Sequence, residues 1–213
     1  MKKINLGSGY VYYVLMCFFV SLGILFVSLV ATSWEVLASE KNYDSYRVKP
    51  ISVEKVNKEG RRVKINYKLP EIKTLPDNFF YGFKEIRNYL WLKLAREPVD
   101  KSKLLLFLAD KRISESLLLM EKNKTSLSLK SARDAVKKLK KSKEWSLKIE
   151  ESEKKLIDSQ LDDARLVYRE VFKRNLEDLE NEEVLRSMAT STKNQKSELE
   201  ELIVELEEWH EEE

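Results

Sequence analysis

The sequence predicts a mainly α-helical protein, with an N-terminal transmembrane helix, an extracytoplasmic antiparallel bundle of long helices and a small β-hairpin at residues 48–69. Three observations support this fold class. Charged residues make up 35% of the chain while glycine (5) and proline (4) are few, which is typical of helical proteins. A charge-free apolar run covers residues 10–31. From residue 75 onward, apolar residues recur at spacings of three and four, the period of one helix face.

The apolar run Tyr10–Ala31 is long enough to cross a bilayer, since it would span roughly 33 Å as a helix. Lys2 and Lys3 precede the run and favour a cytoplasmic N-terminus at residues 1–9, with the C-terminal part exported. Two alternatives remain open. Residues 10–34 are retained as a single-pass signal anchor in the cell membrane, or a signal peptide is cleaved after residue 38 and the chain is secreted. The length of the run favours the anchor.

Residues 35–74 are predicted to hold a tether and the β-hairpin. The tether is the polar segment Ser39–Val48, and a turn at Asn57–Gly60 separates two runs in which apolar and polar residues alternate. The apolar positions are Ile51, Val53, Val63, Ile65, Tyr67 and Leu69. An extended basic linker is the alternative to the hairpin, because residues 41–73 carry ten basic and four acidic residues. Contact of these basic residues with anionic lipid is a weaker alternative than solvation.

Residues 75–180 are predicted to form the helical bundle. Pro76 and Asp77 begin its first helix, which ends at Arg96–Pro98. One face of this helix carries Phe79, Phe80, Phe83, Ile86, Leu90 and Leu94, and Tyr89, Trp91 and Leu92 widen it. We therefore expect this helix to be mostly buried, with its aromatic residues packed in the core.

The second predicted helix is capped by Asp100 or Ser102 and ends at Lys122–Lys124. The short link at Pro98 predicts that it lies antiparallel to the first helix. Its apolar side carries Leu104, Leu105, Leu108, Ile113, Leu117 and Met120, and its polar side carries Asp110, Lys111, Arg112, Glu115 and Glu121. We expect the polar side to be solvated.

Two further helices complete the predicted bundle. The third, capped by Thr125 or Ser126, is expected to bury one apolar face and to expose a lysine-rich face; the buried residues are Leu129, Ala132, Val136 and Leu139. A solvated face is favoured there over a surface for an anionic partner. The fourth follows a coiled-coil-like heptad seam over about two heptads, and is expected to close the bundle; its seam is Ile157, Leu161, Ala164, Tyr168 and Val171.

Residues 181–213 are predicted to form acidic amphipathic C-terminal helices after a break at Asn181–Glu183. Their apolar stripe is Leu199, Leu202, Ile203, Leu206 and Trp209. Residues 150–213 carry twenty-one acidic and nine basic residues, opposite in sign to residues 41–73. We expect the last helix to dock on the third helix and neutralise Lys137–Lys143; presentation to a partner is the alternative.

The opening Leu75-Pro76-Asp77, with Phe80-Tyr81 and Lys84, and the later Leu108-Ala109-Asp110-Lys111-Arg112 resemble an uncharacterised bacterial domain of unknown function. The resemblance covers Leu75 to about Leu179. Such domains usually follow a signal sequence or membrane anchor and sometimes occur in proteins described as anti-sigma-factor-like. The resemblance implies an all-helical extracytoplasmic domain and no catalytic residues. The nine residues before the apolar run are too few for a folded cytoplasmic domain, which argues against the anti-sigma-like arrangement.

The residue inventory argues against an enzyme. The chain has one cysteine, Cys17, and one histidine, His210, so the usual structural zinc sites are excluded. No nucleophile, phosphate-binding or zinc-protease motif is present, and we expect no catalytic residues, no metal site and no cofactor. No interleaved aromatic residues support nucleic-acid binding. We expect a membrane-tethered module that binds an envelope protein; an envelope sensor or regulatory protein is the alternative, and weak cation binding by Glu211–Glu213 is a third.

Overall fold

The structure is a computed structural model that describes residues 12–24, 27–28, 47–56, 62–72, 74–79, 81–186 and 190–209. The predictions for residues 1–9, the cleavage site after residue 38, most of the tether and the hairpin turn at 57–60 lie outside these residues. Residues 12–24 are helical. Within the described ranges, no helix is both long and apolar enough to cross a membrane.

The predicted β-hairpin is confirmed. Strand β1 (Arg47–Val56) pairs antiparallel with β2 (Arg62–Pro70), and the register places Ile51 opposite Tyr67. One face of the hairpin is buried in the main core through Ile51, Val53, Tyr67 and Leu69. The hairpin packs against α3 and α5, which supplies the apolar partner that an isolated two-stranded sheet lacks.

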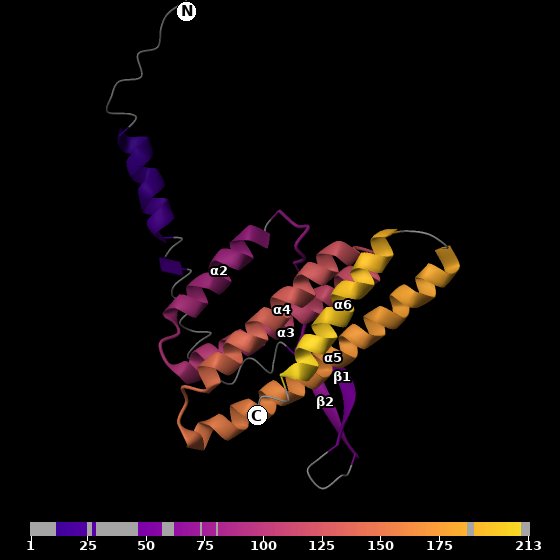
Figure 1. The fold of residues 1–213 in the computed structure, drawn as a ribbon. Helices are drawn as coiled ribbons and strands as arrows, with labels where there is room; N and C mark the ends of the chain where they lie inside the picture. Colours follow the sequence, from indigo (N-terminus) through magenta and orange to yellow (C-terminus); the bar gives the residue numbers. More distant parts are fainter. Residues whose placement is uncertain are drawn as a thin grey trace, which may run out of the picture.

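The rest of the described chain is mainly helical, as predicted. The helices are α2 (Tyr81–Leu94), α3 (Pro98–Glu121), α4 (Thr125–Ser146), α5 (Glu151–Arg186) and α6 (Thr190–Glu208). α3 is the central element, because it contacts α2, α4, α5 and β2. Figure 1 shows α2 at the edge of the bundle, beside α3 and away from α5. The predicted faces of α4 and α5 are confirmed, since the residues expected to be buried there all lie in the main core.

The starts of three helices differ from the prediction. The first helix, α2, begins at Tyr81 and not at Pro76–Asp77, which lie in a turn. The start of α3 also differs. Its N-cap is Glu97 with Pro98 in the first turn, so the expected caps at Asp100 and Ser102 are wrong. Proline suits that position because its missing N–H would have no intrahelical partner. The predicted end at Lys122–Lys124 is confirmed: Asn123 has a φ of 57°, and Lys124 N–H donates to Leu119 O at 2.8 Å. At α4, Lys124 takes the capping position instead of Thr125 or Ser126.

The predicted break at Asn181–Glu183 is wrong, because α5 is continuous to Arg186. The acidic residues there continue the helix, since glutamate is a good helix former. The predicted docking of the last helix is confirmed. α6 packs on α4 and α5, and its apolar stripe enters the main core. Ion pairs flank this contact, including Arg133–Glu198 at 3.1 Å and Lys140–Glu205 at 2.5 Å.

A buried carboxylate joins three elements of the core. Asp110 on α3 is fully buried and accepts hydrogen bonds from the hydroxyls of Tyr67 on β2 and Tyr168 on α5, each at 2.8 Å. The expectation that the polar side of α3 is solvated is therefore wrong for Asp110, and also for Arg112 and Glu115, which are 7% and 1% exposed. Residues 104–116 of α3 are buried, except for the half-buried Lys111, so the polar residues Asp110, Arg112 and Glu115 find partners inside the protein.

Candidate functional site

Most of the face of the first helix that was predicted to be buried is exposed, whereas Trp91, predicted to widen that face, is buried as expected. Phe80 of the predicted face lies outside the described residues. The aromatic face expected in the core is exposed instead: Phe79 by 86%, Phe83 by 65%, Ile86 by 57% and Tyr89 by 59%. The side of α2 that meets α3 carries Tyr81, Lys84, Glu85, Asn88 and Trp91. The candidate functional site is therefore α2 itself, with a polar inner face and an apolar outer face.

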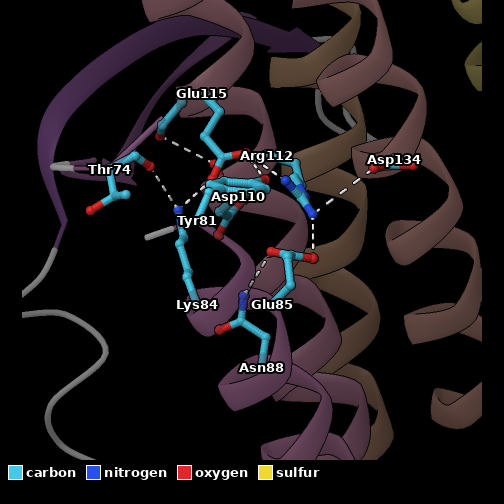
Figure 2. Close-up of polar contacts among 10 residues, drawn as sticks. Thr74, Tyr81, Lys84, Glu85, Asn88, Asp110, Arg112, Glu115 and Asp134 are labelled. Carbon is cyan, nitrogen blue, oxygen red and sulfur yellow. Dashed lines mark hydrogen bonds and ion pairs between the residues drawn. The ribbon is translucent and has the colours of Figure 1, made fainter. Parts of the chain in front are cut away.

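Glu115 on α3 organises the inner face. Its carboxylate accepts hydrogen bonds from Tyr81 Oη at 3.0 Å, from Arg112 Nη1 at 2.8 Å and from Lys84 Nζ. Lys84 Nζ also donates to the carbonyl oxygen of Thr74 at 3.3 Å, so the segment before α2 is bound to the same cluster. Figure 2 shows these side chains converging between α2 and α3. Each donor partly offsets the desolvation of a carboxylate that is only 1% exposed.

Arg112 extends this network along α2. Its Nη2 donates to Glu85 Oε2 at 2.6 Å and lies 3.9 Å from Asp134 Oδ2 on α4 (Figure 2). Glu85 in turn accepts a hydrogen bond from Asn88 Nδ2 at 3.3 Å. Arg112 thus links α2, α3 and α4 through paired charges, and this fixes the rotation of α2 about its own axis.

A small second core lies beyond the polar network. Trp91 and Ala95 pack with Leu104, Phe107 and Leu108 in a cluster separate from the main core. Two cations lie over its rings: Arg87 Cζ is 4.7 Å from the centroid of Trp91, and Lys111 Nζ is 4.2 Å from that of Phe107. The inner face of α2 is therefore held by charge pairs at one end and by an aromatic cluster at the other.

The interface shifts several pKa values. Burial, together with the nearby cations Arg87 and Lys84, lowers the pKa of Lys111 to about 7. Burial also lowers the pKa of Lys138, with Arg112 adding to the effect, and raises the pKa of the Glu85 carboxyl. Burial is the main cause of all three shifts, because it removes the charged groups from water.

The outer face of α2 is mainly apolar. α2 carries three basic residues and one acidic residue, and the acidic one, Glu85, lies on the inner side bound to Arg112. Phe83, Ile86 and Tyr89 leave an exposed apolar surface, with Lys93 Nζ 5.6 Å from the ring of Tyr89. Large contiguous exposed apolar patches of this kind mark interaction sites on soluble domains.

A groove of about 260 Å³ lies between the C-terminal ends of α4 and α6, and it is lined by Lys140, Lys143, Glu144, Leu147, Glu205, Glu208 and Trp209. The ion pair between Lys140 and Glu205 is part of its lining. Among the residues that the structure describes, no group of three or more histidine, cysteine, aspartate or glutamate side chains is arranged to hold a metal ion.

Comparison with known proteins gives one match. The family described as "Domain of unknown function (DUF5667)" matches residues 73–209, which run from the segment before α2 to the end of α6. This confirms the resemblance to a domain of unknown function and extends it beyond Leu179 to include α6. No curated protein and no solved structure matches the chain significantly.

Proposed function

Because this chain belongs to the DUF5667 family of unknown function, we propose its function from the structure: it is a membrane-tethered, extracytoplasmic helical interaction module. Its working surface is the outer face of α2, defined by Phe79, Phe83, Ile86 and Tyr89. The observation that carries the proposal is the exposure of these side chains, three on α2 and Phe79 just before it, while the opposite face of the helix forms ion pairs with α3. A rigid helix presents a surface without the entropy loss of ordering it on binding.

The membrane tether in this proposal is the apolar run at residues 10–34. Its charge-free length fits a retained anchor, and Lys2 and Lys3 favour export of the bundle. A cleaved segment that releases a secreted domain is the alternative, and the same experiment tests it.

The polar chemistry of the bundle supports binding and not catalysis. The buried carboxylates Asp110 and Glu115 accept hydrogen bonds from side chains of the protein, and these bonds join secondary-structure elements. A catalytic acid or base needs an open position for substrate. The sequence predicts an unknown envelope protein as the partner, and it does not predict which surface of the bundle binds it.

The test is photo-cross-linking in cells with the full-length chain. A photoreactive phenylalanine analogue replaces Ile86 on the outer face, or Leu156 on α5 as the matched control. Leu156 is 63% exposed, close to the 57% of Ile86. We expect adducts with protein or lipid at position 86 and few at position 156, in a membrane fraction that retains residues 1–38. Equal labelling at the two positions contradicts the proposed surface, and loss of residues 1–38 contradicts the anchor.

A further inference from the structure

We infer that the outer face of α2 lies on the surface of an anionic lipid bilayer. The inference rests on the proposed function, because it names the occupant of the same face. It goes beyond that function because it assigns a lipid surface, and not a protein, as the binding partner of this face.

The apolar content of the face fits an interfacial helix. Phe79, Phe83, Ile86 and Tyr89 are exposed, and Leu90 and Leu94 lie half-buried beside them in the same helical sector. Phenylalanine and aliphatic residues enter the region between headgroups and acyl chains, and tyrosine favours the boundary itself. A helix of 14 residues can lie flat on the surface with one face immersed and the other bound to the protein.

The charge on and around the face is complementary to anionic lipid. Lys93 is exposed among the apolar residues, and Arg96 is exposed just beyond the end of α2, next to the exposed Glu97. The acidic residue of α2, Glu85, is turned inward and bound to Arg112. Basic residues at the edge of an apolar face bind anionic headgroups.

The remaining charge of the molecule orients α2 toward such a surface. Residues 150–213, which include all of α5 and α6, carry twenty-one acidic and nine basic residues. Figure 1 shows α2 at the side of the bundle away from α5. An anionic surface would repel the acidic helices and attract the basic edge of α2, so the proposed contact is also the favoured orientation.

The experiment uses the full-length chain in proteoliposomes. The Cys17→Ser background receives a single cysteine, Ile86→Cys or the control Leu156→Cys, labelled with an environment-sensitive fluorophore. Vesicles contain phosphatidylcholine alone or with phosphatidylglycerol, and lipids with a nitroxide near the headgroup quench a fluorophore at that depth. We expect at least about threefold stronger quenching at position 86 than at position 156, in phosphatidylglycerol vesicles. Lys93→Glu with Arg96→Glu should reduce the quenching, whereas the exposed α4 control Lys141→Glu should not.

Flotation of the same vesicles separates the possible outcomes. Flotation with strong quenching at position 86 supports the inference. Flotation with equal weak quenching at the two positions overturns the bilayer contact and leaves the proposed function intact, with a protein as the occupant of the face. Failure to float overturns the tether and the bilayer contact together.

Discussion

Replacing Glu115 by glutamine should loosen α2 from the bundle. The amide has the same size as the carboxylate, but one of its two oxygens is replaced by an NH₂ group. That NH₂ group cannot accept the hydrogen bonds that Tyr81, Lys84 and Arg112 donate to Glu115. Arg112 keeps Glu85 at 2.6 Å and Asp134 at 3.9 Å, so it stays compensated. Lys84, whose side chain is 12% exposed, keeps only the Thr74 carbonyl among its partners described above.

The expected loss of stability follows from this difference between Arg112, which keeps two carboxylates, and Lys84, which keeps none of those described above. Breaking a buried ion pair typically costs about 3–5 kcal/mol. Since Arg112 retains its other carboxylates, we expect a smaller loss. The free energy of local opening of α2 should fall by about 2–4 kcal/mol. At about 1.4 kcal/mol per factor of ten, amide hydrogens of α2 should then exchange about 30- to 1,000-fold faster.

The assay is native-state hydrogen exchange on the full-length chain in nanodiscs, read separately for α2 and α4. Glu121→Gln on the same helix is the matched control, because Glu121 is exposed. Lys84→Met should add little to Glu115→Gln, since its main partner is already lost. Equal exchange of α2 in the Glu115→Gln and Glu121→Gln variants would refute the assignment of Glu115 as the attachment point.

Three further predictions concern stability, measured by urea unfolding. Tyr168→Phe should cost about 1.5–3 kcal/mol, because it removes a donor to the buried Asp110 carboxylate; an unchanged midpoint would contradict this. Lys111 has a pKa of about 7 in the folded state against 10.5 unfolded, so the folded state binds fewer protons and wild-type stability should rise between pH 7 and 10. Lys111→Met should be more stable than the wild type at pH 7, and its stability should not rise between pH 7 and 10. If the rise persists in this variant, other titrating groups cause it. Leu206→Ala should cost about 2–5 kcal/mol, whereas Lys140→Ala should cost under about 1 kcal/mol because its ion pair is half-exposed; similar losses would argue against docking of α6 by apolar burial.

The faces of α4 and α5 were predictable because each helix has one apolar side and one charged side. Val136 and Leu139 recur with the helical period against lysines, and the buried side follows directly. α6 was predictable for a second reason, since its acidic face complements the lysines of α4. In these helices the local pattern carries enough information to orient the element.

The orientation of α2 was not predictable by the same reasoning. The spacing of Phe83 and Ile86 identifies a helix and an apolar stripe, but it does not say what covers that stripe. The side that is buried contains Lys84, whose partner Glu115 lies 31 residues away in the sequence. The periodicity of a sequence shows which residues share one face of a helix. It does not show which residue on another helix pairs with them. For the same reason the buried charges of α3 were expected in solvent.

The separation of the bundle into two apolar clusters has a consequence for how this domain tolerates change. Trp91 and Ala95 belong to the small cluster with Phe107, whereas the hairpin, α4, α5 and α6 share the main one. Substitutions that weaken the small cluster can therefore release α2 while the remainder stays folded. Substitutions on the exposed side of α2 and substitutions in the main core therefore affect the stability of different parts of the protein.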